Sequence, residues 1–229
     1  MLCQGETPVA RPYDIITFDC YGTLIDWEGG IGEAFAQAAL ADRVKLDRKV
    51  LLDAYAEVEP IVEAEAYRSY RSILSETARR VAARFGWSLS QERAGFLAES
   101  LPRWRPFADT NPALEQLGAA GYRLGILSNV DNGLLARTLR HLTVKFDLLV
   151  TAQQVGSYKP AHGHFLRARE RIGAQRWLHA AQSYFHDVVP ARALGIPVAW
   201  VNRKGETATG SARPDQEFRT LADLADWLA

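Results

Sequence analysis

Residues Ile15-Ile16-Thr17-Phe18-Asp19-Cys20-Tyr21-Gly22-Thr23-Leu24 form an apolar run that ends in a carboxylate and a glycine-containing turn. The run predicts a buried strand, with Asp19 at the edge where open α/β sheets bind ligands. Side chains alternate along a strand, so Asp19 and Cys20 should point in opposite directions. Cys20 has no neighbouring histidine or cation in the sequence to activate its thiol. We therefore interpret Cys20 as a packed thiol and Asp19 as the side chain presented at the ligand-binding edge.

The composition is that of a globular enzyme without strong charge bias. The chain has 229 residues, of which 48% are hydrophobic, and its 27 basic and 27 acidic residues give a net charge of zero. This balance argues against a nucleic-acid or membrane partner. No apolar run approaches the ~20 residues that span a bilayer. Residues 1–11 lack a signal-peptide pattern, so we expect a cytoplasmic protein, and two cysteines, Cys3 and Cys20, make a disulfide framework improbable.

Strand-like and helical stretches alternate along most of the chain. Near-continuous apolar runs predict parallel strands that are covered on both faces. The predicted strands are 14–20, 122–128, 146–151, 178–183 and 197–201, and the predicted helices are 112–120, 132–141, 162–172, 188–194 and 220–228. The alternation predicts an α/β protein with a Rossmann-like, doubly wound parallel sheet.

One block interrupts this alternation. Residues 28–104 contain no convincing strand and predict helices at 31–41, 48–59, 65–85 and 91–101. We interpret the block as a helical cap that is inserted after the first strand, above Asp19. Residues 1–27 and 105–229 then form the catalytic core. The polar stretch 204–214 is predicted to be a mobile surface loop.

Polar segments follow four of the predicted strands. Asp19 follows the first, Ser128 and Asn129 the second, Lys159 the third and Asp187 the fourth. Because parallel strands end at one edge of a sheet, we expect these side chains to converge. A carboxylate with a lysine, a hydroxyl and a second carboxylate is a plausible nucleophilic site.

Three stretches carry a resemblance to a known family. They are residues 18–27 (FDCYGTLIDW), 156–160 (GSYKP) and 181–187 (AQSYFHD). The chain resembles the haloacid dehalogenase superfamily over about residues 13 to 228. It is most similar to the type II (S)-2-haloacid dehalogenase branch, which includes azetidine-2-carboxylate hydrolase-like members.

The resemblance implies a two-step hydrolysis of a small 2-haloalkanoic acid. Asp19 displaces the leaving group at C2 and forms an aspartyl ester, which water then hydrolyses with net inversion at C2. Lys159 keeps Asp19 ionised, and Asp187 positions the water. Thr23 and Ser183 orient Asp19 and Lys159. The implied substrate-binding residues are Cys20, Tyr21, Ser128, Asn129 and Tyr184, together with the backbone N–H groups of the 21–23 turn. No cofactor is implied, and a homodimer is possible.

Two positions distinguish this chain from the magnesium-dependent phosphatases of the superfamily. Those enzymes carry an aspartate general acid two residues after the nucleophile, and here that residue is Tyr21. Their fourth motif has two acidic residues, which fall on Ser183 and Asp187. A phenol of pKa near 10 is a poor acid at neutral pH. We therefore expect a site without a metal.

The cap departs from the dehalogenase pattern. Dehalogenases receive the halide with a cap arginine, whereas residues 50–63 contain no arginine or lysine. Arg68 and Arg71 of the next predicted helix are the candidates to reach in, and we interpret them as solvated helix charges. Two further positions depart from the family pattern. The family's asparagine in the fourth motif is replaced by Tyr184, and its tyrosine a few residues after the lysine is replaced by Phe165.

Other functions therefore stay open. The cap glutamates, which are Glu57, Glu59, Glu63 and Glu65, favour a leaving group that carries positive charge, as in ring opening of azetidine-2-carboxylate. A magnesium-dependent phosphatase and a non-catalytic anion-binding protein are the further alternatives. His186, beside Asp187, is interpreted as structural and pointing away from the site.

Overall fold

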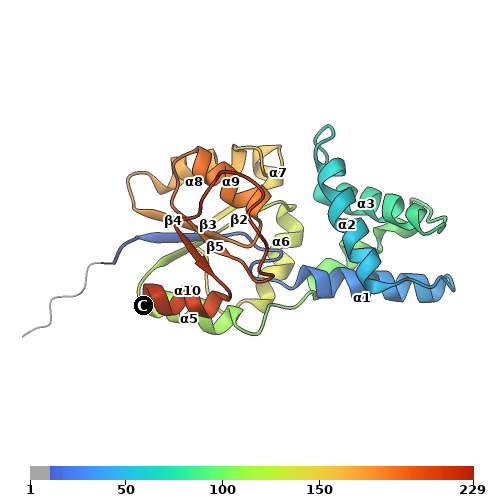
Figure 1. Ribbon diagram of the computed structural model, residues 1–229, viewed down its shortest axis with the longest axis horizontal. Helices are drawn as coiled ribbons and strands as arrows, with labels where there is room; N and C mark the ends of the chain where they lie inside the picture. The colour runs from blue at the N-terminus through green and yellow to red at the C-terminus, as the bar shows by residue number, and fades with distance from the viewer. Residues whose placement is uncertain (1–10) are drawn as a thin grey trace, which may run out of the picture.

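The computed structural model describes residues 11–229, so Cys3 and the first ten residues lie outside the described part (Figure 1). Its centre is a six-stranded sheet in which every pair of neighbours is parallel. The strands are β1 (Ile15–Phe18), β2 (Arg123–Ser128), β3 (Leu148–Thr151), β4 (Trp177–Ala181), β5 (Val198–Val201) and β6 (Gln216–Phe218). Their order is β3-β2-β1-β4-β5-β6.

The position of β1 in this order places the site. Phe18, the last residue of β1, lies opposite Ile126 of β2 and Ala180 of β4. The chain builds β2 and β3 on one side of β1 and then β4 to β6 on the other. This reversal is the topological switch point where open sheets leave a crevice. Asp19 follows directly and stands at that crevice.

Helices cover both faces of the sheet, as Figure 1 shows. On one face lie α5 (Thr110–Ala119) and α10 (Leu221–Leu228), and on the other lie α8 (Gly163–Ile172) and α9 (Val189–Ala193). The short helices α6 (Asn132–Thr138) and α7 (Ala152–Val155) follow β2 and β3. Strands β1, β4 and β5 are buried throughout, as expected for strands covered on two sides. The predicted fold class is confirmed.

A helical block follows β1 and projects from one end of the sheet (Figure 1). It contains α1 (Trp27–Ala41), α2 (Arg48–Glu63), α3 (Tyr70–Arg84), α4 (Phe96–Ser100) and the short 3₁₀ turns η1 (Arg93–Gly95) and η2 (Leu101–Arg103). The chain enters and leaves it side by side, because Ile25 forms an antiparallel bridge with Pro106. We call residues 27–103 the cap. None of the helices in the described part of the chain is both long and apolar enough to cross a membrane.

Among the differences between the elements and the predictions, three have a clear local cause. Strand β6 was missed, because its Gln-Glu-Phe sequence has no apolar alternation and it lies at the sheet edge. Helix α3 begins at Tyr70 rather than 65, since the Ser69 side chain accepts from the Ser72 N–H and caps the helix there. Strand β4 ends at Ala181 rather than 183, because Ser183 caps a π-helical turn, η4 (Tyr184–Val188).

Candidate active site

A cavity of about 550 Å³ lies between the cap and the carboxyl end of the sheet. The core contributes Asp19, Lys159 and Asp187 to its lining, and α2 of the cap contributes Glu59 and Glu63. The predicted convergence of the strand ends is therefore present in the structure. The 204–214 stretch, expected on the outer surface, also lines the cavity through residues 204, 206, 207 and 209.

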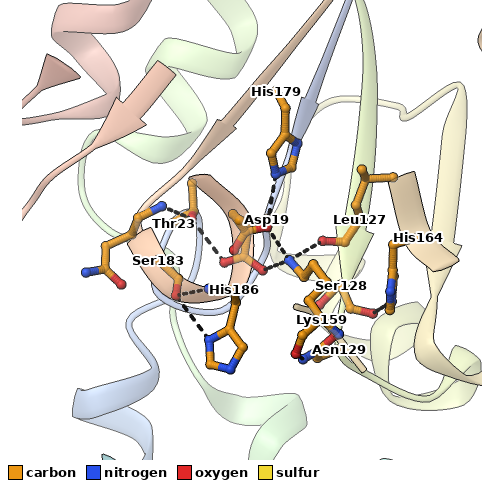
Figure 2. Close-up of polar contacts among 12 residues, drawn as sticks. Asp19, Thr23, Leu127, Ser128, Asn129, Lys159, His164, His179, Ser183 and His186 are labelled. Carbon is orange, nitrogen blue, oxygen red and sulfur yellow. Dashed lines mark hydrogen bonds and ion pairs between the residues drawn. The ribbon is translucent and has the colours of Figure 1, made fainter. Parts of the chain in front are cut away.

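The centre of the cavity is a buried lysine between two carboxylates (Figure 2). Lys159 Nζ donates to Asp19 Oδ1 at 2.9 Å and to Asp187 Oδ1 at 2.6 Å. Its third hydrogen bond goes to the carbonyl oxygen of Leu127 at 2.9 Å. An ammonium group has three protons, so this set satisfies Lys159 completely. No proton of the ammonium is left to donate to a further group.

Burial and neighbouring charges shift the pKa values of these three groups in opposite directions. Burial works against the charged form of Lys159, but Asp187 and Asp19 outweigh it and hold the lysine pKa above its usual range. Burial also opposes the charge of Asp187, yet Lys159 and His179 lower its pKa to about 2. Burial raises the pKa of Asp19, and the ammonium of Lys159 counters part of this rise. Lys159 and Asp187 are therefore charged at neutral pH, and Asp19 depends on Lys159 for its charge.

The turn after β1 holds the second oxygen of Asp19. Thr23 Oγ1 donates to Asp19 Oδ2 at 3.0 Å and accepts from the Gln182 N–H at 2.9 Å. Gly22 adopts φ +103°, and a Cβ there would lie 3.0 Å from the Trp27 ring, so this position needs glycine. Arg203 donates to the carbonyl of Thr23 at 2.9 Å and fixes the turn from the β5 side.

The loop that carries Lys159 is fixed by Asn129. Asn129 Oδ1 accepts from the Lys159 N–H at 2.7 Å, and its Nδ2 donates to the Lys159 carbonyl at 3.1 Å. Gly156 takes the left-handed conformation, with φ +65°, that ends α7 before this loop. Asn129 therefore positions the lysine, in addition to lining the cavity.

A chain of hydrogen bonds between side chains of β1 and β4 orients Asp187. His179 Nε2 lies 3.0 Å from Asp187 Oδ1, and His179 Nδ1 lies 2.8 Å from Thr17 Oγ1. Trp177 Nε1 donates to the same hydroxyl at 2.7 Å. Ionised Asp187 can only accept, so His179 Nε2 carries a proton and donates it to Asp187. This histidine was not predicted, although a polar residue inside the apolar run 177–181 is a signal for it.

Three core residues that line the cavity have a buried polar atom without a hydrogen-bond partner among residues 11–229. The atoms are Ser128 Oγ, Asp187 Oδ2 and His186 Nε2, and Ser128 and Asp187 are about 1% exposed. Buried polar groups are nearly always paired in proteins, and an unpaired one facing a cavity points to a ligand or water. Ser128 can donate to a substrate oxygen, and Asp187 can accept from a water.

The structure places several predicted site residues differently from the expectation. The Cys20 side chain is fully buried and is not part of the cavity lining, where it was expected to contact substrate. Ser183 makes no hydrogen bond to Lys159; it lines the cavity and bonds to His186 Nδ1 at 3.1 Å. His186 faces the cavity instead of pointing away, and burial lowers its pKa to about 4, so its ring is neutral. The Gly22 N–H, expected to bind substrate, already donates to the Ile25 carbonyl at 2.8 Å.

Two tyrosines that were predicted to bind substrate do line the cavity, but their hydroxyl groups are engaged elsewhere. The Tyr21 hydroxyl lies 2.8 Å from Thr138 Oγ1. The Tyr184 hydroxyl donates to the carbonyl of Ala212 at 2.9 Å. Both tyrosines therefore offer ring surface rather than a free phenol, and Tyr21 is not placed as a general acid.

The cap side of the cavity contains no arginine. Arg68 pairs with Glu65 at 2.7 Å, and Arg71 lines a separate surface hollow with Asp131. In the part of the chain that the structure describes, Lys159 and Lys204 are the only basic residues, other than histidine, that line the cavity. Two glutamates, Glu59 and Glu63, lie where an arginine was sought.

The residues do not suit a divalent metal. Lys159 Nζ lies between Asp19 and Asp187, so its positive charge would repel a cation bound by that pair. Ser183 occupies the position at which the phosphatase pattern has a further acidic residue. Across residues 11–229, no group of three histidine, cysteine or acidic side chains is arranged to hold a metal. The donor set therefore lacks the several hard oxygen ligands that Mg²⁺ prefers.

Comparison with known proteins assigns the family. The model of the haloacid dehalogenase-like hydrolases matches residues 13–218, which is most of the chain. The chain belongs to this family. The hydrolase is 28% identical to the (S)-2-haloacid dehalogenase H-109 of Pseudomonas putida, over 95% of this chain and 99% of the relative. The crystal structure of the L-2-haloacid dehalogenase PA0810 superposes with a TM-score of 0.78 at 25% identity, covering 94% of this chain and 98% of that one.

Other relatives of this hydrolase carry different names. A glyceraldehyde 3-phosphate phosphatase of Methanothermobacter thermautotrophicus is 28% identical over 82% of this chain and 84% of the relative. The dehalogenase and the phosphatase are thus equally similar in sequence to this hydrolase, at 28% identity. The choice between attack on carbon and attack on phosphorus therefore depends on the site residues of this hydrolase.

Proposed function

We propose that the hydrolase displaces a leaving group at C2 of a small 2-substituted carboxylic acid through an ester on Asp19, without a metal ion. The observation that carries the proposal is Lys159, buried between Asp19 and Asp187. A fixed ammonium keeps a buried carboxylate ionised, and so nucleophilic, without a divalent ion. The 2-haloalkanoic acids are the proposed substrates, because the haloacid dehalogenases are similar to this chain over nearly its whole length.

The two steps use different groups. A carboxylate oxygen of Asp19 attacks C2, the C2–halogen bond breaks, and the halide leaves with the bonding electron pair. A water that Asp187 Oδ2 orients then adds to the Asp19 carbonyl carbon. The ester bond between that carbon and the substrate oxygen breaks, which releases a 2-hydroxy acid and regenerates Asp19. Only the first step touches C2, so the configuration inverts there.

The rest of the cavity supports a small anionic substrate at this position. Ser128 Oγ is buried and unpartnered in the described chain, and it lines the cavity beside the reaction centre. It can donate to the substrate carboxylate. The rings of Tyr21 and Trp104, packed edge to face at 5.9 Å, give an apolar wall for the carbon chain.

Single turnover in heavy-oxygen water tests the proposal. With enzyme in excess over (S)-2-chloropropanoate and a chelator present, we expect chloride release, and mass spectrometry of the digested protein should find one ¹⁸O on Asp19. Asp19→Asn should abolish turnover. Label that enters the product but never Asp19, or turnover that needs Mg²⁺, would contradict the proposal and favour direct water attack or a phosphatase.

A further inference from the structure

A buried histidine at the start of α8 has no part in the two proposed steps. His164 is the second residue of that helix and is fully buried. Its Nε2 lies 3.0 Å from the carbonyl oxygen of Ser128 (Figure 2). A carbonyl oxygen can only accept, so Nε2 carries a proton and donates it to Ser128.

The other ring nitrogen of His164 is left without a partner. Burial lowers the pKa of this ring to about 3, and the positive charge of Lys159 adds to the effect. The ring is therefore neutral at neutral pH, and Nδ1 is an acceptor only. Nδ1 is buried and has no hydrogen-bond partner among residues 11–229. An unpaired buried acceptor lowers stability, which an apolar side chain would avoid. The Nε2 donor, rather than packing, accounts for a histidine here.

The bond from His164 is one of several that join the Lys159 loop to the end of β2. Lys159 Nζ donates to the Leu127 carbonyl at 2.9 Å, and Asn129 exchanges two hydrogen bonds with the Lys159 backbone. His164 holds Ser128, the residue between them. Three consecutive residues at the end of β2 are thus held by one short segment, which also carries the lysine of the reaction centre.

The Ser128 backbone decides where its hydroxyl points. Ser128 Oγ lines the cavity and has no hydrogen-bond partner in the described chain, so no contact of its own fixes its direction. The Ser128 carbonyl accepts from the Val130 N–H at 2.9 Å and from His164. Val130 belongs to the same loop and moves with it. His164 comes from another element and is therefore the external anchor of this peptide group.

We propose that His164 is a positioning residue for substrate binding, which holds the Ser128 backbone so that the Oγ hydroxyl faces the substrate carboxylate. This inference rests on the carboxylate contact of Ser128 in the proposed function. His164 is not part of the cavity lining, so it acts only through Ser128. Its effect should fall on binding of the carboxylate rather than on the displacement at C2 by Asp19.

His164→Leu tests the inference, because it removes the donor together with the unpaired acceptor. The loss of one hydrogen bond predicts a rise of about tenfold in KM for (S)-2-chloropropanoate and in Kd for propanoate, with kcat changed less than about twofold. His164→Gln, whose amide nitrogen can reach the Nε2 position, should return both constants to within about threefold of the wild type. A merely structural histidine would instead alter kcat and KM together, without rescue by glutamine. That result, or unchanged constants in both variants, would overturn the inference.

A double-variant comparison tests whether the effect passes through Ser128. Ser128→Ala removes the hydroxyl and leaves the backbone in place, so it should weaken propanoate binding by itself. Adding His164→Leu to Ser128→Ala should then change the Kd of propanoate less than about twofold, since no hydroxyl is left to position. Losses that multiply in the double variant would overturn the inference.

The matched control is His162→Leu, two residues away at the start of the same helix. His162 is exposed, and its side chain makes no capping hydrogen bond. This variant should bind propanoate as the wild type does. Propanoate has no leaving group, so its binding does not depend on an ester at Asp19. Impaired binding in Ser128→Ala with none in His164→Leu would overturn only the positioning role. Absence of ¹⁸O on Asp19 would overturn the ester and leave the binding results standing.

Discussion

In the proposed reaction, Asp19 and Lys159 set the pH at which the site can react. Asp19 would attack only as a carboxylate, so we expect activity above its pKa and a loss of activity as the pH falls through it. Burial raises that pKa above the ordinary aspartate value near 3.9, and Lys159 limits the rise. Lys159 itself keeps its proton, because the two carboxylates hold its pKa above the usual lysine range.

The pH profile of kcat/KM should therefore show one limb, on the acid side, that reports the protonation of Asp19 beside Lys159. We expect an acid limb at a higher pH than that of a free aspartate, and no loss from lysine deprotonation up to about pH 10. Asp187, with a pKa of about 2, titrates too low to produce this limb. A steady-state profile on (S)-2-chloropropanoate checks this. Constant activity down to pH 3.5, or an alkaline fall centred below pH 9 that vanishes in Lys159→Arg, would contradict the assignment.

In the proposed reaction, His179 would act only through Asp187, to which it is hydrogen-bonded, and so would be a positioning residue. It shares Asp187 Oδ1 with Lys159, which leaves Asp187 Oδ2 to face the cavity. Without this donor, Asp187 can rotate and lose its hold on the hydrolytic water. The first step, which uses Asp19, does not need that water.

His179→Asn should consequently slow the second step more than the first. One hydrogen bond to a charged group contributes about 1.5–3 kcal/mol, so we expect kcat to fall about 10- to 100-fold. The Asp19 ester should then accumulate and appear in the intact mass after acid quench. His179→Gln, whose amide can reach the Nε2 position, should restore much of the rate. A slower enzyme without accumulated ester would indicate a merely structural histidine.

At the scale of elements, the sequence predicted the sheet because its strands are buried on both faces. The runs that became β1, β2, β3 and β5 are nearly continuous in apolar residues, which is a strong pattern. Edge strand β6 has exposed or half-buried residues and no such pattern, so it could not be found. Its pairing with β5 is a tertiary effect.

The site residues also divide into those that a sequence pattern predicts and those whose position depends on tertiary structure. Asp19, Lys159 and Asp187 were predictable as neighbours, because parallel strands bring their following loops to one edge. The roles of Asn129 and Ser183 were not, since each depends on a loop conformation that no local pattern specifies. Helix α2 was predicted, but only its packing shows that Glu59 and Glu63, rather than Glu57 and Glu65, line the cavity.

At the scale of the whole molecule, the site exists only where the cap and the core meet. Asp131, just before α6 of the core, accepts from the backbone N–H groups of Tyr70 at 2.8 Å and Arg71 at 3.0 Å. These groups begin α3 of the cap, where the helix dipole favours a negative charge. Tyr158 adds a hydrogen bond to the Arg68 carbonyl at 2.7 Å. The cap is thus held to the core beside the cavity.

Asp131→Ala should loosen this attachment while leaving the reaction centre intact. The loss of two hydrogen bonds to a carboxylate should lower the free energy of unfolding by about 1–3 kcal/mol. Because Tyr70 supports Glu59, we expect a rise in KM of several-fold with a much smaller change in kcat. Steady-state kinetics and urea unfolding measure the two effects.

Asp226→Ala is the matched control, since that carboxylate accepts from Gln116 Nε2 at 3.0 Å on the face of the core covered by α5 and α10. It should leave KM unchanged. If Asp131→Ala lowers stability but binds substrate as the wild type does, cap attachment does not shape the cavity. If instead kcat falls and KM does not, Asp131 influences Asn129 and Ser128 through their shared loop, and the two parts of the molecule act on chemistry rather than on binding.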